Sequence, residues 1–395
     1  MSKKEPTPGG VTGPQRSLSY GRQWIDDQDI AAVVEVLKSD FLTTGPKVKE
    51  FEEKFSQYVG SKYAVAVSNG TAALHVACLA SGLSQRQELI TSPLTFAASA
   101  NCALYCGTTP VFVDVDNNGL IDEEKIERKI TRKTRVIIPV HYSGLPCDME
   151  PIQKIAQKHH LVIIEDACHA IGARYKQTRI GDCTFSDQTV FSFHPAKQLT
   201  TGEGGMITTN SKEIYEKLLL FRNHGITKDP QKYINPNQGP WYHEMQNLGF
   251  NYRITDFQCA LGISQLKKID TYIEKRRQIA KQYDDAFQGH ETLEILTENP
   301  NVWNSYHLYP LRVNDAETRL RFFNFLRTKG IFCQVHYIPV YLHPYYQSLG
   351  YKEGLCPCAE NFYQRELSLP IYPLMNKNDV AYVIEQIFSG LNEAV

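Results

Sequence analysis

The sequence lacks an excess of either charge. It has 42 lysines and arginines against 43 aspartates and glutamates, which gives a formal net charge of −1 at pH 7. Proteins that bind nucleic acids or membrane surfaces usually carry a basic patch. The composition therefore predicts no nucleic-acid partner and no membrane partner, although it leaves room for a local basic pocket that binds a phosphorylated ligand.

Long apolar runs are also absent. No stretch reaches about 18 consecutive apolar residues, the length that suggests a membrane-spanning helix. The first 17 residues are polar and rich in proline and glycine, and they lack the apolar segment of a secretory signal. We therefore expect a cytoplasmic protein.

The ten cysteines lack the regular spacing of a disulfide scaffold, which favours a reducing compartment. The tightest pair, Cys356 and Cys358, has no second such pair and no histidine nearby. Asp166 and His169 also lack further clear ligands. The sequence therefore predicts no metal site.

Short apolar runs alternate with helical patterns in the first half of the chain. With 42% hydrophobic residues, the 395-residue chain is neither wholly disordered nor collagen-like. Its length suits about two to three domains, or one large α/β domain with a smaller companion. The alternation is typical of a mostly parallel sheet covered on both faces. The predicted strands cover residues 63–67, 110–113, 136–140, 161–164, 189–193 and 206–209.

The flanking segments predict the domain organisation. Two amphipathic helices precede the first strand, and residues 228–247 are predicted to form a long loop. One long helical pattern runs from Thr255 to about Phe287, and an α+β pattern follows it. This predicts a flexible tail over 1–20, an N-terminal arm and large domain over 21–255, and a linking helix with a small domain over 256–395. The predicted elements of the small domain are a strand over 308–313, a helix over 316–329, a strand over 331–335 and a helix near 378–391.

Two polar segments follow predicted strands. Residues 68–71 form a turn that leads into a helix, and a helix N-terminus suits a phosphate group. A plain helix cap at Asn69 is the alternative. Asp166 follows the strand at 161–164, and ligands of open α/β sheets bind at the carboxyl ends of the strands. Capping of the next helix is the alternative for Asp166.

A lysine and a second polar segment complete the pattern. Lys197 lies between a predicted strand and a glycine-rich turn, where glycines allow tight backbone geometry near a ligand. A solvated surface lysine is its alternative. Asn251 and Arg253 precede the long helix and are free to reach a phosphate, also across a subunit boundary. Together these groups meet the needs of pyridoxal phosphate (PLP), namely an amine, an acid for its ring nitrogen and a phosphate site.

At the motifs over residues 192–205 and 251–256, the sequence resembles the DegT/DnrJ/EryC1/StrS sugar aminotransferases, which are fold type I PLP enzymes. The resemblance covers nearly the whole chain from residue 42. It implies the PLP-dependent transferase fold type I of the α/β class. The large domain then holds a mostly parallel seven-stranded sheet, and a smaller α+β domain lies at the C-terminus.

The resemblance also implies roles for individual residues. Lys197 would form the Schiff base with pyridoxal 5'-phosphate, and Asp166 would pair with the pyridine nitrogen. Gly70, Thr71 and Ser192 would hold the phosphate.

Three further roles follow from the same resemblance. Phe96 would stack on the ring of the cofactor, and His169 would lie near its phenolic oxygen. Asn251 would reach the phosphate of the cofactor in the neighbouring subunit. The family works as a homodimer with composite active sites, so we expect the same assembly here.

Within the family, residues 193–197 and 334–341 are most similar to the transaminases of pseudaminic acid biosynthesis. This implies a UDP-linked 4-keto-6-deoxy-N-acetylhexosamine as acceptor, L-glutamate as donor and UDP-4-amino-4,6-dideoxy-N-acetyl-β-L-altrosamine as product. His336 and Tyr337 are candidate substrate residues, although a strand and turn that pack the small domain also fit this segment. Arg253 is a candidate for substrate binding on charge alone.

Other functions fit less of the sequence. A sibling aminotransferase for another nucleotide-linked or lipid-linked keto sugar, of the perosamine, 4-aminoarabinose or 3-amino sugar type, shares most of the motifs. Related C-3 dehydratases have histidine where this chain keeps Lys197. A non-catalytic nucleotide-sugar-binding protein would be free to lose Lys197 or Asp166, and both are present.

Overall fold

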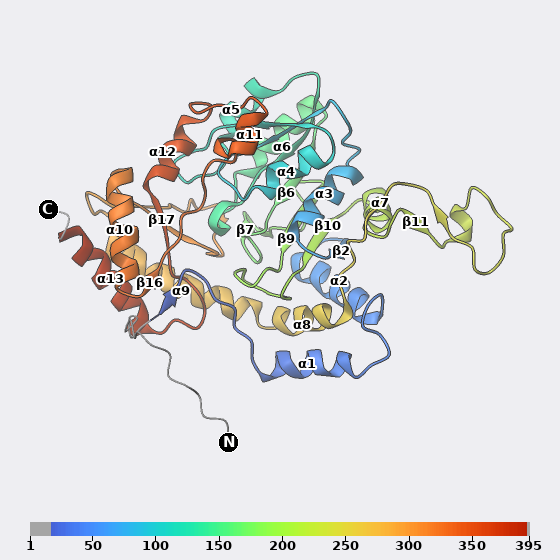
Figure 1. Cartoon of the computed structure of the whole chain (residues 1–395), viewed down its shortest axis with the longest axis horizontal. Coiled ribbons are helices and arrows are strands. Elements are labelled where there is room, and N and C mark those ends of the chain that lie inside the picture. The colour runs from blue at the N-terminus through green and yellow to red at the C-terminus, as the bar shows by residue number, and fades with distance from the viewer. Residues whose placement is uncertain (1–16, 393–395) are drawn as a thin grey trace, which may run out of the picture.

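A seven-stranded sheet forms the centre of the computed structural model, which describes residues 17–392 (Figure 1). β10 runs antiparallel to both of its neighbours, and the other pairings are parallel. The mostly parallel seven-stranded sheet is therefore confirmed. Its order is β2 (Tyr63–Val67), β10 (Gly205–Thr209), β9 (Gln188–Ser192), β6 (Val162–Asp166), β5 (Thr134–Ile138), β3 (Glu88–Thr91) and β4 (Thr109–Phe112).

Both faces of this sheet are buried. Ala64 and Ala66 join one hydrophobic cluster, whereas Val65 and Val67 join another, because successive side chains of a strand point to opposite faces. Burial on both faces explains why the strands are continuous apolar runs. The helices that contribute to the first cluster include α2 (Pro46–Val59) and α6 (Met149–His159), and those in the second include α3 (Gly70–Ala80), α4 (Ala98–Tyr105) and α7 (Lys212–Arg222).

The sequence pattern missed β3, which lies between β5 and β4. Its four residues contain two aliphatic side chains, Leu89 and Ile90, and both are fully buried. A run this short does not stand out from a loop, so the strand is defined by its neighbours in the sheet.

The helix predicted from Thr255 to Phe287 is two helices, and the prediction of one helix is wrong. The break falls at Lys267 and Lys268, between α8 (Asp256–Leu266) and α9 (Ile269–Phe287). The apolar periodicity continues through the break, so it gave no signal. Cys259 and Ile263 of α8 pack in the cluster of the large sheet, and the domain boundary at residue 256 stays a prediction.

The C-terminal part forms a smaller α+β unit, as predicted. A three-stranded antiparallel sheet packs with the second half of α9 and with two further helices around a separate hydrophobic cluster. These elements are β13 (Glu294–Ile295), β15 (Tyr309–Arg312), β17 (Glu366–Leu369), α10 (Ala316–Thr328) and α13 (Lys377–Asn392). Further helices and strands are α1 (Asp27–Leu37), α5 (Glu123–Ile126), α11 (Pro344–Ser348), α12 (Pro357–Arg365), β7 (Arg174–Tyr175), β8 (Thr178–Arg179) and β14 (Val302–Trp303).

The N-terminal segment is fastened to this smaller unit. Of the tail predicted over 1–20, residues 1–16 lie outside the described residues. In the remaining part, β1 (Leu18–Ser19) pairs in parallel with β16 (Ile331–Phe332). Leu18 is buried in the small cluster. The strand predicted over 331–335 spans only Ile331 and Phe332, and it pairs with the N-terminal segment.

The predicted loop over 228–247 is largely irregular. It is closed at its base by β11 (Ile226–Thr227) and β12 (Glu244–Met245), and it extends away from the body (Figure 1). Among residues 17–392, no helix is long and apolar enough to cross a bilayer, and no cluster of three ligating side chains is arranged to hold a metal ion. All ten cysteines are free.

Candidate active site

A cavity of about 800 Å³ opens beside the last residues of β6 and β9. This is the carboxyl edge of the parallel strands, where open α/β sheets bind their ligands. Asn251 and Arg253 are absent from its lining. The other predicted residues line it together: Gly70, Thr71, Phe96, Asp166, His169, Ser192, Lys197, His336 and Tyr337.

One end of the cavity is the N-terminus of α3. The Asn69 side chain caps the helix by accepting a 2.8 Å hydrogen bond from the Ala72 N–H. The first N–H groups of a helix, here those of Gly70 and Thr71, have no acceptor within the helix and carry its positive dipole end. A Cβ on Gly70 would lie 3.0 Å from Cβ of Ser192. Gly70 therefore leaves space beside the Ser192 hydroxyl that suits a phosphate.

The Asp166 carboxylate at the end of β6 is held in a fixed orientation. Its Oδ2 accepts a 2.6 Å hydrogen bond from the Ser99 hydroxyl, and its Oδ1 accepts one of 3.1 Å from the Cys168 N–H. Asp166 is buried with 4% of its surface exposed. A buried, oriented carboxylate can hold a proton on a basic ring nitrogen that enters the cavity.

The Lys197 amine lies in the same cavity, and its Nζ is 3.4 Å from Nε2 of His307. Burial lowers the pKa of Lys197, and the nearby Cys168 and Asp166 partly oppose this effect. A lower pKa increases the share of neutral amine, which is the nucleophilic form. Lys197 is therefore suited to attack an aldehyde.

The turn after Lys197 is tightly constrained. The N–H of Phe193 donates to the Gly204 carbonyl at 2.9 Å, which brings the two ends of the turn together. A Cβ on Gly205 would lie 2.6 Å from the carbonyl oxygen of Asn69. The glycine at 205 thus allows the turn that follows Lys197 to pack against the start of α3.

The wall around His169 is aromatic and uncharged. The Nδ1 atom of His169 accepts from the Ser143 N–H at 3.3 Å, and its Nε2 lies 3.1 Å from the Tyr337 hydroxyl. Burial lowers the pKa of His169, and burial lowers the pKa of His336 to about 3. Phe96 is 61% exposed at the mouth of the cavity. Flat neutral side chains of this kind suit an aromatic ring.

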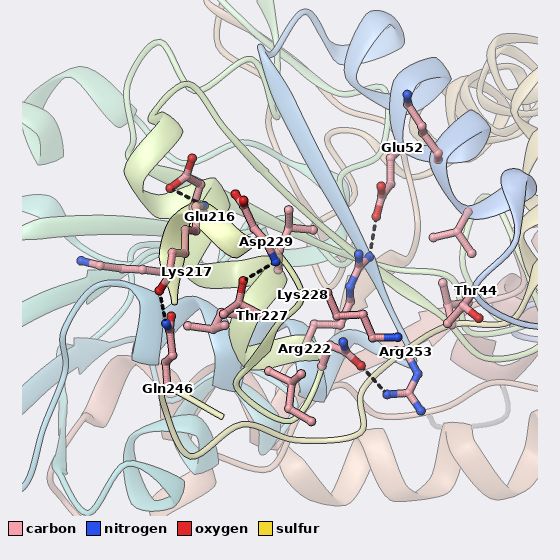
Figure 2. A pocket seen from close by; sticks show the side chains of 18 of the residues that line it. Thr44, Glu52, Glu216, Lys217, Arg222, Thr227, Lys228, Asp229, Gln246 and Arg253 are labelled. Carbon is pink, nitrogen blue, oxygen red and sulfur yellow. Dashed lines mark hydrogen bonds and ion pairs between the residues drawn. The ribbon is translucent and has the colours of Figure 1, made fainter. Parts of the chain in front are cut away.

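Asn251 and Arg253 lie elsewhere on this chain. Arg253 donates a 2.6 Å hydrogen bond to Oδ1 of Asn223 and lines a second cavity, of about 680 Å³ (Figure 2). Arg222 and Lys228 line the same cavity, and Arg222 forms an ion pair with Glu52. Asn251 is exposed. Neither residue can therefore be assigned to the Lys197 cavity within one chain.

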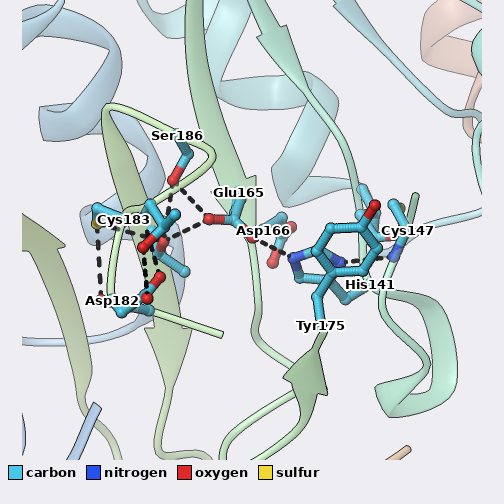
Figure 3. Close-up of polar contacts among 12 residues, drawn as sticks. His141, Cys147, Glu165, Asp166, Tyr175, Asp182, Cys183 and Ser186 are labelled. Carbon is cyan, nitrogen blue, oxygen red and sulfur yellow. Dashed lines mark hydrogen bonds and ion pairs between the residues drawn. The ribbon is translucent and has the colours of Figure 1, made fainter. Parts of the chain in front are cut away.

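A buried polar network supports the end of β6 from the other face of the strand (Figure 3). Oε2 of Glu165 lies 2.8 Å from Nε2 of His141, whose Nδ1 accepts from the Cys147 N–H. Burial by itself would raise the pKa of Glu165, but hydrogen bonds from His141, Ser186 and Thr189 outweigh it and leave the pKa lowered. The network fixes the strand end that presents Asp166.

Sequence reasoning missed several residues of the cavity. Ser99 reaches Asp166 from α4, and His307 reaches Lys197 from the segment before β15. Tyr20 and Tyr252 also line the wall. Ser99, His307 and Tyr20 are single polar side chains outside the motifs, so only the fold reveals their place. Tyr252 belongs to the motif over 251–256, but the sequence gave it no role.

Comparisons with known proteins agree with this geometry. The model of the DegT/DnrJ/EryC1/StrS aminotransferase family matches residues 23–388. The structure of PseC from Helicobacter pylori, an aminotransferase involved in the biosynthesis of pseudoaminic acid, superposes with a TM-score of 0.89 at 34% identity. This match covers 96% of this chain and 100% of that one.

Three sequence relatives match this chain over most of their own length. The spore coat polysaccharide biosynthesis protein SpsC of Bacillus subtilis is 43% identical over 94% of this chain and 96% of that protein. The UDP-4-amino-4,6-dideoxy-N-acetyl-β-L-altrosamine transaminase of Campylobacter jejuni is 38% identical over 95% of this chain and 98% of that protein. The GDP-perosamine synthase of Escherichia coli O157:H7 is 37% identical over 90% of this chain and 93% of that protein.

Proposed function

This chain belongs to the DegT/DnrJ/EryC1/StrS aminotransferase family, and from that premise we propose that it moves the amino group of L-glutamate to C4 of a UDP-linked 4-keto sugar. The chain is a PLP-dependent sugar aminotransferase. The proposed acceptor is UDP-2-acetamido-2,6-dideoxy-β-L-arabino-hexos-4-ulose, and the proposed product is UDP-4-amino-4,6-dideoxy-N-acetyl-β-L-altrosamine. The Campylobacter transaminase and the Helicobacter structure support this choice of sugar.

One observation carries the proposal: an amine, an oriented carboxylate and a helix N-terminus share one cavity. PLP has an aldehyde, a basic ring nitrogen and a phosphate, so each of its groups has a counterpart. Lys197 would bind the aldehyde carbon, Asp166 the ring nitrogen, and Gly70, Thr71 and Ser192 the phosphate. The space that a Cβ on Gly70 would fill supports this fit.

The neutral wall of the cavity would hold the flat face of the cofactor. Phe96 would stack on the ring, and His169 would lie at its phenolic oxygen. The hydrogen bond from the Ser143 N–H to Nδ1 of His169 leaves the proton on Nε2 of that ring. His169 is therefore prepared to donate toward Tyr337 or toward an oxygen that enters the cavity.

The residues divide the chemistry between them. When bound, PLP supplies an electron-withdrawing ring that stabilises negative charge on the carbon next to the transferred nitrogen. Asp166 keeps a proton on the ring nitrogen, which maintains that withdrawal. The Nζ of Lys197 takes the proton from the α-carbon of L-glutamate and, in the second half-reaction, delivers one to C4 of the sugar. Positioned proton transfer of this kind contributes about 10²–10⁴-fold in rate.

We include a homodimer with composite sites in the proposal. Phe41 and Leu42 are 54% and 48% exposed, and Leu37 on α1 (Asp27–Leu37) is 55% exposed, so an apolar surface lies uncovered on the single chain. A second copy is the partner that suits such a surface. Asn251 of the partner subunit would then reach the phosphate held in this cavity, whose own lining does not include Asn251.

Substrate contacts are part of the same proposal. His336 and Tyr337 would face the sugar, because both line the cavity. Arg253 would serve a site in a neighbouring copy, because within its own chain it lines the second cavity.

A sibling activity is the second candidate. The perosamine synthase is 37% identical, almost as similar as the altrosamine transaminase at 38%. This observation supports a GDP-linked 4-keto-6-deoxy sugar as the alternative acceptor.

The test offers the purified protein UDP-, GDP- and dTDP-linked 4-keto sugars with L-glutamate and identifies each amino sugar by mass spectrometry and NMR. Amination of the UDP sugar, with little amination of the GDP sugar, is expected. The reverse preference would establish the second candidate. Lys197→Ala is the matched control, and borohydride reduction followed by peptide mapping should place the pyridoxyl label on Lys197 in the unaltered protein.

A further inference from the structure

The side chain of His307 lies at the base of the cavity in a rigid setting. The buried Arg276 donates from one guanidinium nitrogen to the carbonyl oxygens of Tyr306, His307 and Ile371, at 3.2, 3.3 and 2.7 Å. The N–H of Leu308 donates to the Ser143 carbonyl at 3.2 Å. The backbone on both sides of His307 is thereby fixed, and the residue is 3% exposed.

The two ring nitrogens of His307 differ in their surroundings. Nε2 lies 3.4 Å from Nζ of Lys197, whereas Nδ1 has no hydrogen-bond partner among the described residues. In contrast, Nδ1 of His169 accepts from a backbone N–H, and Nδ1 of His336 lies 2.8 Å from the Ser368 hydroxyl. No neighbour therefore fixes which nitrogen of His307 carries the proton.

The unfixed position of the His307 proton matters because Nε2 of this ring lies next to Lys197. With the proton on Nδ1, Nε2 of His307 accepts a hydrogen bond from an ammonium group. With the proton on Nε2, the ring donates to a neutral amine. An amine that takes and delivers protons passes through both forms, so an imidazole without a fixed tautomer matches each of them.

Burial and the neighbouring groups keep His307 neutral. Burial lowers its pKa most, and Lys197, His169, Arg276 and His336 add to the effect. The His169 ring lies 4.4 Å from the His307 ring, centroid to centroid. A neutral imidazole remains able to accept from the lysine throughout the ordinary pH range.

We propose that His307 is a positioning residue that receives the amine of Lys197 whenever this amine is not bonded to the cofactor. The proposal rests on the proposed function, because it assigns the lysine a second location in the catalytic cycle. Held at His307, the amine stays in the cavity, close to the atoms between which it moves protons.

The test measures the proton affinity of Lys197 directly in the full-length protein freed of cofactor. Competitive labelling with limiting acetic anhydride, from about pH 6 to about pH 11, followed by mass spectrometry of the Lys197 peptide, gives the midpoint of its titration. His307→Leu should lower that midpoint by about one pH unit, because the hydrogen bond that His307 accepts from the charged ammonium is about twice as strong as the one that it donates to the neutral amine. His307→Gln, which keeps an acceptor, should restore most of the shift.

The controls separate this role from a structural one. His75→Leu removes another buried histidine that bonds Tyr252, and it should leave the Lys197 midpoint unchanged. If His307→Leu does not fold, His307→Asn replaces it, because its amide is too short to reach the amine. An unchanged midpoint in the chosen variant, or an equal shift in His307→Gln, would overturn the proposal. Absence of a pyridoxyl label on Lys197 in the unaltered protein would instead refute the proposed function.

Discussion

The Ser99 hydroxyl lies 2.6 Å from Oδ2 of Asp166 and donates a hydrogen bond to it within the buried wall of the cavity. Ser99 belongs to α4 and Asp166 ends β6, so the bond joins a helix to the strand end. The orientation of the carboxylate therefore depends on a residue that no motif of the sequence marks.

Ser99→Ala should weaken cofactor binding by about tenfold, because a hydrogen bond to a charged group is lost and the Asp166 carboxylate is freed to rotate. Titration of the cofactor-free protein with PLP, followed by absorbance, measures the dissociation constant. Ser56→Ala, which removes an exposed hydroxyl on α2, should bind PLP as the unaltered protein does. Equal affinity in Ser99→Ala would remove Ser99 from the site.

Gly205→Ala should disturb the phosphate site, because the added Cβ would lie 2.6 Å from the Asn69 carbonyl oxygen and 3.0 Å from the Gly70 nitrogen. Relief of this contact moves the start of α3 and costs about 1–3 kcal/mol in stability. Thermal unfolding and the PLP dissociation constant report the two effects. Gly21→Ala, whose Cβ would meet Ala196 at 3.7 Å, is the matched control. A variant as stable and as tight in binding as the unaltered protein contradicts this account.

Lys268→Met should destabilise the junction of α8 and α9. The Lys268 ammonium lies 2.8 Å from carboxylate oxygens of Asp26 and Asp29, and the side chain of Asp29 is fully buried. Removal of the cation leaves that carboxylate without its ion pair, at an expected loss of about 3 kcal/mol in the free energy of unfolding by denaturant. The exposed neighbour offers the control, since Lys267→Met should change stability by less than about 0.5 kcal/mol. Equal effects of the two substitutions would show that the ion pair is unimportant.

Mixing two inactive variants should restore activity if the sites are composite. Lys197→Ala lacks the amine, and Asn251→Ala lacks the group that we assign to the neighbouring cavity. Random exchange of subunits then gives about a quarter of the sites a native set of residues. Activity of the mixture after subunit exchange, compared with each variant alone, is the measurement. A mixture as inactive as its components would place Asn251 in the cavity of its own chain.

The stability of the protein should respond to the protonation of Glu366. Burial raises the pKa of this residue from 4.5 to about 8. The folded protein thus keeps a proton that the unfolded chain releases between these values, so stability falls as the pH rises through this window. Glu366→Gln lacks the effect, and the difference in melting temperature between variant and unaltered protein should grow from about pH 5 to about pH 8. A difference in melting temperature that stays constant across that range would contradict the raised pKa of Glu366.

The sequence predicted those parts of the fold that depend on local pattern. The strands of the large sheet are apolar runs buried on both faces, and the turn at 68–71 carries its own cap at Asn69. β3 and the break at Lys268 escaped prediction because the neighbouring elements determine them. The four residues of β3 form a strand because they lie between two other strands, and the break at Lys268 lies where this residue forms ion pairs with Asp26 and Asp29.

The residues of the site could likewise be predicted only where a local pattern marks them. Lys197 and Asp166 were found because each follows a strand and belongs to an extended motif. His307 and Ser99 touch these two residues across long stretches of sequence, and a lone polar residue gives no pattern to read. Arg253 illustrates the opposite case, since its charge and spacing were visible while its cavity was not.

The pairing of β1 with β16 brings Tyr20 to the same wall as Tyr337. During synthesis, this wall has no second half until the segment around Tyr337 has left the ribosome. Nascent chains that carry only the large sheet therefore present an unfinished binding site. A cavity whose wall joins the first described residues to the last third of the chain is therefore completed only late in the synthesis of each polypeptide.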